Sequence, residues 1–232
     1  FSIVTKTPLF REKETTGKDV ELLKIAFHES LEKLQLSSIY GLLVHRASDL
    51  FRPNANLLVD EMKSLVDDGK VQKIGFSAYT LAEIDRVLEF FVPDLVQIPL
   101  NVFDQRLLKN CGLEKLKSLG VEVQARSTFL QGLLLMDPTN IDSYFTPIKS
   151  HIEKYASFLG KQGYSQLQGA LSFSLNQELV DTVLVGVCSC RQLEEIMKAT
   201  KSTTYRSVDF SDFALKDERF IDPSLWKLGN RT

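Results

Sequence analysis

The residues of this sequence that could carry chemistry follow apolar runs that resemble buried strands. The segment SSIYGLLVHRASDL, residues 37–50, is the clearest case, because its apolar run leads directly to His45. Such a run suits a strand that is buried on both faces, as in a parallel sheet. Parallel sheets place their chemistry at the carboxyl ends of the strands. The sequence therefore predicts that the His45 imidazole lies at a functional edge of a sheet.

Polar side chains also end the other apolar runs. Lys6 ends the first run and Ser77 ends the third. The same position is held in later runs by Gln97, Asn101, Arg126, Ser127 and Ser189. The carboxyl face of an α/β barrel carries the active site, so we expect these side chains to converge there. The alternative explanation is that polar residues end most strands simply because a loop begins at that point.

Strand-like and helix-like segments alternate six times along the chain. The expected strands are residues 1–6, 39–45, 71–79, 94–101, 121–127 and 181–187. The expected helices, with apolar residues at helical spacing, are residues 19–36, 56–70, 81–91, 112–120, 150–163, 165–177 and 190–200. Thr80 and Glu83 form a capping box before one helix, and Gly69 ends another. Alternation with short connections requires a parallel sheet with right-handed crossovers, either open or closed as a barrel.

The number of strands bears on that choice. A closed α/β barrel needs eight strands, and only six are recognisable here. The chain also opens inside a strand at Phe1. We therefore expect either an open sheet or a sequence that lacks its beginning.

The composition suits one domain with a sizeable core, since the chain has 232 residues, is 44% hydrophobic and carries a net charge of −2. This charge does not suggest a nucleic acid partner. No apolar run approaches the roughly 20 residues of a membrane helix, and no signal peptide opens the chain, so we expect a cytoplasmic protein. Cys111, Cys188 and Cys190 show neither metal-site nor disulfide spacing, so we expect reduced thiols and no metal.

Six motifs in order carry a resemblance to a known family. They are VTKT at 4–7, LLVHR at 42–46, KIGFSAY at 73–79, LVQIPLNVFDQ at 95–105, STFLQGLLL at 127–135 and VLVGVCSCRQLEE at 183–195. Together they resemble an aldo-keto reductase from its third barrel strand onward. The resemblance implies a TIM (β/α)8 barrel whose first strands are absent from the sequence. It also implies a single domain over residues 1–232, with a C-terminal tail at 208–232 that either covers the substrate opening or packs as a cap.

The resemblance implies a catalytic tetrad of Asp, Tyr, Lys and His. Lys6 is the implied lysine and His45 the implied histidine, whereas the aspartate and tyrosine belong to segments that would precede Phe1. A tyrosine near pKa ~10 is a poor acid unless an ammonium group beside it favours its ionised form, and Lys6 would be that group. His45 would hydrogen-bond the carbonyl oxygen of the substrate. Tyr79 is a weaker alternative acid, and Tyr40 lies at the wrong end of its strand.

The family binds NADPH without a Rossmann fold, which agrees with the lack of a GxGxxG motif here. By resemblance, Ser77 and Gln97 hold the nicotinamide carboxamide, although Ala78 replaces a customary asparagine. Arg126 stands where many relatives have an aromatic that stacks on the nicotinamide, and a guanidinium can stack as well. The segment that would cover the pyrophosphate comprises Ser127, Phe129, Leu130, Gln131 and Gly132.

The last expected helix has its own anion-binding features. Ser189 and Gln192 form an S-x-x-Q capping box, and a helix N-terminus attracts phosphate. The resemblance assigns the adenosine 2′-phosphate and adenine to Gly186, Cys188, Ser189, Gln192 and Glu195. Cys188 replaces a common serine, and Ile196 replaces the usual asparagine. Arg191 is either a further phosphate partner or a solvated surface charge.

Two functions remain open at this point. The first is an NADPH-dependent oxidoreductase that transfers a hydride to the carbonyl of a small aldehyde or ketone. The second is a non-catalytic barrel subunit that binds the nicotinamide cofactor in a regulatory role. Lys6 and His45 together favour the enzyme. We expect a small-molecule carbonyl substrate as partner, and neither nucleic acid nor membrane.

Overall fold

The computed structural model describes residues 1–109, 111–202 and 208–228. It divides into two compact units. The first unit comprises Phe1–Ile98 and Cys111–Gln124, and the second comprises Pro99–Asn110 and Ala125–Thr232. In the described part of the chain, no helix is long and apolar enough to cross a membrane.

Six strands form one sheet, in the order in which they occur in the sequence. They are β1 (Val4–Lys6), β2 (Ile39–Val44), β3 (Val71–Ser77), β4 (Leu95–Pro99), β5 (Glu122–Arg126) and β6 (Thr182–Val183). The register is parallel, with Lys6 opposite Leu43 and Ser77 opposite Gln97. The expected number and order of strands are confirmed. The last strand is shorter than the expected 181–187. Its pairing with β5 continues as far as Leu184, whose N–H donates to the Ala125 carbonyl at 2.7 Å.

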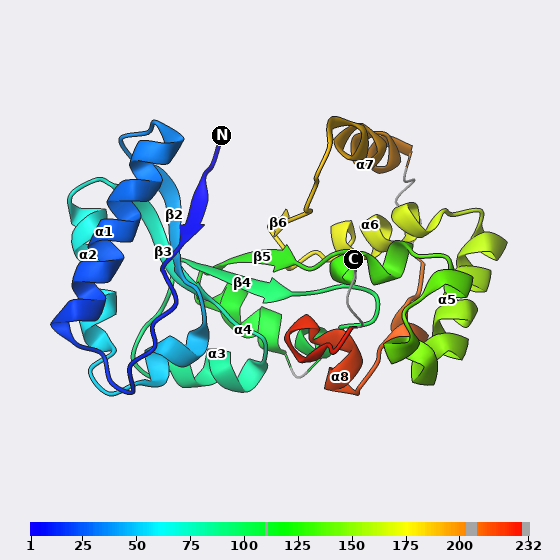
Figure 1. Cartoon of the computed structure of the whole chain (residues 1–232), viewed down its shortest axis with the longest axis horizontal. Coiled ribbons are helices and arrows are strands. Elements are labelled where there is room, and N and C mark those ends of the chain that lie inside the picture. Colours follow the sequence, from blue (N-terminus) through cyan, green and yellow to red (C-terminus); the bar gives the residue numbers. More distant parts are fainter. Residues whose placement is uncertain (110, 203–207, 229–232) are drawn as a thin grey trace. The chain divides into compact units, whose positions relative to one another are not determined.

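The helices of the first unit are α1 (Gly17–Leu34), α2 (Asn56–Asp67), α3 (Leu81–Leu88) and α4 (Gly112–Ser118). In α1 the buried apolar residues Leu23, Phe27 and Leu31 recur every fourth position, which makes one apolar face. Helix α1 packs against α2, and α2 packs against β3 (Figure 1). The predicted capping box of Thr80 and Glu83 is present at the start of α3.

One glycine in this unit is required by the close approach of two strands. A Cβ atom at Gly75 in β3 would lie 1.6 Å from the backbone oxygen of Leu95 in β4. A side chain at this position would therefore push the two strands apart. Gly69 ends α2 in the left-handed region with φ of 67°, as the sequence predicted.

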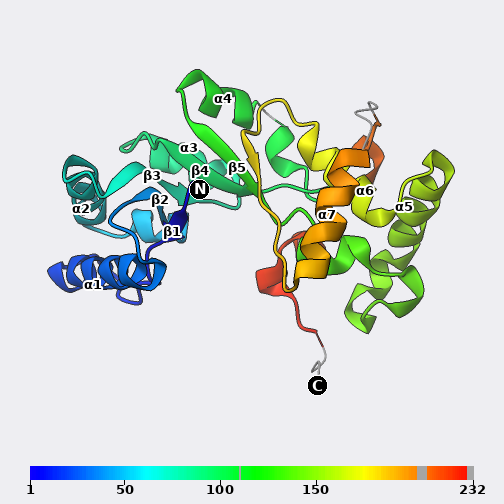
Figure 2. The ribbon, with the colours of Figure 1, turned by 90° about the horizontal axis from the view of Figure 1, so that it is seen from above.

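The second unit contains α5 (Lys149–Gln162), α6 (Gln166–Leu175), α7 (Cys190–Ser202) and α8 (Glu218–Ile221). Helices α6 and α7 lie side by side (Figure 2), with Leu171 of α6 in one apolar cluster with Ile196 and Ala199 of α7. Between β5 and α5 lie short 3₁₀ helices at Leu130–Leu135, Pro138–Asn140 and Ser143–Ile148, which are not among the expected elements.

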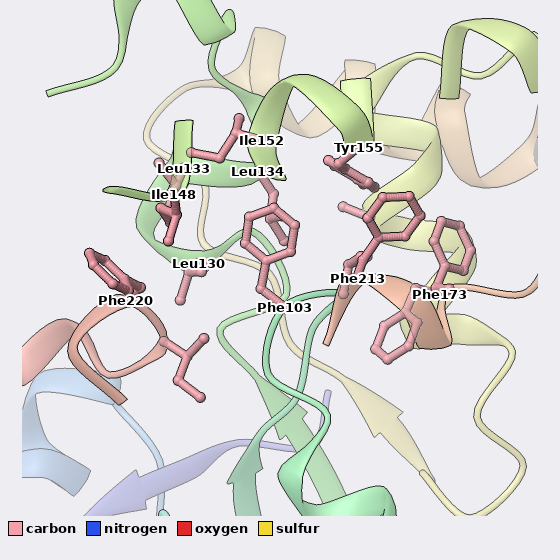
Figure 3. Packing of buried hydrophobic residues seen from close by; sticks show 14 of the residues in the cluster. Phe103, Leu130, Leu133, Leu134, Ile148, Ile152, Tyr155, Phe173, Phe213 and Phe220 are labelled. Carbon is pink, nitrogen blue, oxygen red and sulfur yellow. The ribbon is translucent and has the colours of Figure 1, made fainter. Parts of the chain in front are cut away.

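Aromatic side chains fill the core of the second unit. The Tyr155 ring packs against the rings of Phe103 and Phe213, at centroid distances of 5.5 and 5.4 Å in edge-to-face geometry (Figure 3). The described part of the C-terminal tail, residues 208–228, contributes Phe213 and Phe220 to this core. The remaining tail residues, 229–232, lie outside the described residues.

Candidate functional site

Lys6 and His45 lie at the same end of neighbouring strands in the first unit. Lys6 is the last residue of β1, and His45 follows the last residue of β2. The two strand ends are tied together by Thr7, whose N–H donates to the Leu43 carbonyl at 2.9 Å. The Thr7 hydroxyl in turn accepts from the N–H of His45 at 3.2 Å. The fold thus brings the two candidate catalytic residues to one sheet edge, and their chemical roles stay a prediction.

Ser77 and Gln97 are adjacent across the β3–β4 ladder. They are opposite each other in the register, and both are buried. The N–H of Ala78 donates to the Gln97 carbonyl at 3.0 Å, which continues the pairing past Ser77. The side-chain amide of Gln97 donates to Oε1 of Gln124 at 3.4 Å. Three polar side chains, those of Ser77, Gln97 and Gln124, are therefore buried in consecutive strands of the sheet.

The two tyrosines that were considered as acids occupy different ends of the strands. Tyr40 lies near the start of β2, where its hydroxyl donates to Oε2 of Glu122 at 2.5 Å. The ammonium of Lys73 lies 5.1 Å from the centre of the Tyr40 ring. These contacts hold Tyr40 at the amino edge of the sheet, as expected. Tyr79 follows β3 at the carboxyl edge, and its N–H donates to Oε2 of Glu83 at 2.6 Å.

The second unit contains a cavity of about 620 Å³. Its lining includes eight of the residues expected to bind a cofactor, namely Ser127, Phe129, Gln131, Gly132, Gly186, Cys188, Gln192 and Glu195. Of the other expected residues in this unit, Leu130 points into the core with no exposed surface, and Arg126 and Ser189 are not among the lining residues. The cavity size is typical of a small-molecule or cofactor site.

The loop after β5, which contributes several residues to the lining of this cavity, has a strained backbone. Ser127, Leu130 and Gln131 have φ values of 62°, 46° and 53°, a left-handed conformation that non-glycine residues rarely adopt. Gly132 has φ of 89°, where a glycine is required. Each strained non-glycine residue costs about 1–3 kcal/mol, so the surrounding structure must hold it in place.

Asn101 supplies part of that support. It is completely buried, and its Nδ2 donates to the Ser127 carbonyl at 3.1 Å. Its Oδ1 accepts from the N–H groups of Phe103 and Asp104, each at 3.0 Å. The Thr128 hydroxyl also donates to the Leu184 carbonyl at 3.0 Å. The sequence placed Asn101 at a strand end but did not reveal this supporting role.

The start of α7 shows the expected capping in a modified form. The Ser189 hydroxyl accepts from the Gln192 N–H at 3.2 Å. The Gln192 side chain accepts from the N–H of Cys188 at 2.7 Å, one residue before the position that a reciprocal box would use. Arg191 is 87% exposed and pairs with Glu195 at 2.9 Å. This exposed ion pair favours the explanation of Arg191 as a surface charge.

The model of the aldo/keto reductase family matches residues 1–216. The chain belongs to this family of oxidoreductases. It is 29% identical over 231 residues to L-galactose dehydrogenase of Arabidopsis thaliana, covering 95% of this chain and 70% of that protein. It is 23% identical to L-glyceraldehyde 3-phosphate reductase of Escherichia coli O157:H7, covering 90% of this chain and 66% of that protein.

Solved aldo-keto reductase structures agree with this assignment. The holo form of AKR11C1 from Bacillus halodurans superposes with a TM-score of 0.72 at 18% identity, covering 91% of this chain and 70% of that one. The glycerol dehydrogenase AKR11B4 from Gluconobacter oxydans gives 0.57 at 17% identity, covering 86% and 68%. The parallel strands and their crossover helices therefore have the TIM-barrel arrangement of the family, as expected from the sequence.

Sequence inspection missed one buried polar residue of this aldo/keto reductase, Gln124. Gln124 lies in β5 with only 4% of its surface exposed, and it joins Gln97 to Glu122 by hydrogen bonds. The motif VEVQARS did contain a signal, because a glutamine stands inside a strand that was expected to be buried on both faces. A buried amide needs partners, and that requirement could have drawn attention to it.

Proposed function

We propose that this aldo/keto reductase transfers a hydride from NADPH to the carbonyl carbon of a small, sugar-like aldehyde or ketone. The observation that carries the proposal is the pair Lys6 and His45 at the joined carboxyl ends of β1 and β2. The sugar-like substrate class is supported by the relatives, whose names specify L-galactose and L-glyceraldehyde 3-phosphate.

The residues of this chain would serve the reaction in distinct ways. The Lys6 ammonium would favour ionisation of a neighbouring tyrosine acid, and so make that tyrosine able to protonate the developing alkoxide. The tyrosine itself is not assigned to any residue of 1–232. The His45 imidazole would hydrogen-bond the carbonyl oxygen and hold it in position. NADPH supplies the hydride when it is bound.

The cavity of the second unit fits part of a dinucleotide. Gly132 and Gly186 both line it, and a Cβ atom built on either would meet no atom within 4 Å. Bare backbone thus faces open space at two places, which allows a phosphate or ribose to approach closely. We assign this cavity to the pyrophosphate and adenosine part of NADPH. In the first unit we assign Ser77 and Gln97 to the nicotinamide carboxamide.

Substitution of Gly186 tests this assignment. Its φ is not in the left-handed region, and no atom lies within 4 Å of a Cβ atom built on it, so Gly186→Val should fold normally and add two methyl groups to the lining of the cavity. We expect at least a tenfold weaker Kd for NADPH and an unchanged Tm without ligand. Gly160→Val is the matched control, because Gly160 is exposed on α5 and also has open space around its Cβ direction.

The cofactor preference is measured on the unmodified chain. NADPH should raise the Tm more than an equal concentration of NADH, because tighter binding to the folded state gives greater stabilisation. Equal shifts would contradict the NADPH assignment. Binding of NADPH without any carbonyl reduction, in a protein that also contains the tyrosine acid, would favour the non-catalytic alternative.

A further inference from the structure

A chain of hydrogen bonds runs through the first unit from the start of β5 to the proposed nicotinamide residue Gln97. Oε2 of Glu122 accepts from the Lys73 ammonium at 2.7 Å and from the Tyr40 hydroxyl at 2.5 Å. Oε1 of Glu122 accepts from Nε2 of Gln124 at 3.1 Å. Oε1 of Gln124 then accepts from Nε2 of Gln97 at 3.4 Å.

The negative charge of Glu122 determines which groups donate and which accept in this series of hydrogen bonds. An ionised carboxylate only accepts hydrogen bonds, so Gln124 must present its NH₂ group to Glu122. Its oxygen therefore faces Gln97, and Gln97 must in turn present its own NH₂ group to Gln124. The carbonyl oxygen of the Gln97 side chain takes no part in the series of hydrogen bonds from Glu122. It remains the group that Gln97 can offer to a ligand.

The surroundings of Glu122 support its ionised form. Burial opposes ionisation, but hydrogen bonds from Lys73, Tyr40 and Gln124 outweigh it and lower the pKa of Glu122. The hydrogen bond with Glu122, followed by that with Tyr40, raises the pKa of Lys73. Gln97 and Gln124 are 6% and 4% exposed, so water cannot easily replace either partner. The direction of the chain should therefore persist at neutral pH.

We propose that Glu122 and Gln124 are positioning residues that present the Gln97 side-chain oxygen to the NH₂ group of the nicotinamide carboxamide. This inference rests on the proposed function. The orientation of Gln97 matters more in this protein because Ala78 stands beside Ser77 and has no side-chain hydrogen-bonding group. If the Gln97 amide were reversed, its NH₂ group would face the NH₂ group of the nicotinamide carboxamide, and two donors cannot form a hydrogen bond.

Three probes separate the contribution of the carboxamide from the rest of the cofactor. They are NADP⁺, its 3-acetylpyridine analogue, which has a methyl group in place of the carboxamide NH₂, and 2′-phospho-ADP-ribose, which lacks nicotinamide. Calorimetric Kd values are measured for the unmodified chain and for Gln124→Met. Gln72→Met is the matched control, because Gln72 is an exposed glutamine in β3 of the same sheet.

The unmodified chain should bind NADP⁺ about threefold to tenfold more tightly than the acetyl analogue, as expected for one hydrogen bond. Gln124→Met should reduce this ratio to near one and leave the Kd of 2′-phospho-ADP-ribose unchanged. Gln72→Met should keep the full ratio. A general loss of stability would weaken the binding of all three probes together. The ratio of the Kd values for NADP⁺ and the acetyl analogue therefore isolates the positioning effect.

A second variant tests whether the Glu122 carboxylate sets the direction of the hydrogen bonds. It also covers the case in which Gln124→Met does not fold. In Glu122→Gln the new amide can donate to Gln124. This allows the direction of all the hydrogen bonds to reverse, so that the NH₂ group of Gln124 donates to the Gln97 side-chain oxygen. The ratio of Kd values should again fall toward one. An unchanged ratio in either folded variant would overturn the inference while leaving the proposed function intact. Failure of the unmodified chain to bind any of the three probes would overturn both.

Discussion

At the scale of single residues, the proposed reaction depends on the charge of Lys6. Lys6→Met keeps the length of the side chain and removes the ammonium that would activate the acid. In a protein that also contains the tyrosine acid, we expect kcat for carbonyl reduction to fall by at least about 100-fold, as is typical when acid catalysis is lost. The Kd for NADPH should change by less than about threefold. Steady-state kinetics and calorimetry measure the two effects, and Lys63→Met, an exposed lysine on α2, is the control.

His45 has a different expected signature. His45→Ala should lower kcat and also raise KM for the carbonyl substrate, because the imidazole is proposed to orient the substrate in both the ground state and the transition state. His28→Ala is the control, since His28 is exposed on α1, where its Nδ1 hydrogen-bonds with the Lys24 carbonyl of the same helix. Parental rates for both Lys6→Met and His45→Ala would rule out the reductase proposal.

At the scale of elements, the loop after β5 is held in shape by Asn101. Asn101→Ala would leave the buried N–H groups of Phe103 and Asp104 without their acceptor. Buried donors without partners cost about 1–3 kcal/mol each, so the loss of both partners should lower the free energy of unfolding by about 2–6 kcal/mol. Urea unfolding followed by the fluorescence of Trp226, which packs 4.8 Å from the Phe145 ring, measures this loss.

The same substitution should loosen the strained segment that Asn101 supports through the Ser127 carbonyl. Hydrogen exchange of residues 127–132 should become faster in Asn101→Ala than in the unmodified chain. Asn140→Ala is the control for both measurements because Asn140 is exposed in a 3₁₀ helix. Protection unchanged at 127–132 would show that the loop conformation does not depend on Asn101.

The elements themselves were largely predictable from local patterns. Helix α3 begins where the Thr80 and Glu83 spacing predicted it, and α2 ends where Gly69 predicted, because caps are determined by neighbouring residues. The short β6 and the 3₁₀ helices after β5 were not predicted. Their conformations depend on partners distant in sequence, such as the bond from Thr128 to the Leu184 carbonyl. Apolar residues alone do not encode such partners.

At the scale of the whole molecule, six motifs in order were enough to predict the family and its barrel fold. The connection from Glu122 through Gln124 to Gln97 could not be predicted in this way. Its hydrogen bonds join side chains on β4 and β5, and its charged end also involves Tyr40 from β2 and Lys73 from β3. Side-chain networks of this kind require knowledge of which strands are neighbours and in which register.

The charged end of this network also makes stability depend on pH. The pKa of Glu122 is lower in the folded chain than the ordinary glutamate value of about 4.3, so ionised Glu122 stabilises the fold fully above that pH. As the pH falls below about 4.3 and through the folded pKa, this stabilisation is lost. Charged hydrogen bonds of this type contribute about 2 kcal/mol. The free energy of unfolding of Glu122→Gln should therefore be lower than that of the unmodified chain at pH 7.

Urea unfolding at pH 7, 5, 4 and 3 checks this expectation. The difference between the unmodified chain and Glu122→Gln should be constant from pH 7 to pH 5 and should shrink at pH 4 and pH 3. Glu29→Gln is the control, because Glu29 forms an exposed ion pair with Lys33 on α1, and such pairs contribute little. A difference that stays constant down to pH 3 would mean that Glu122 does not titrate in this range and does not contribute its charge to the stability of the fold.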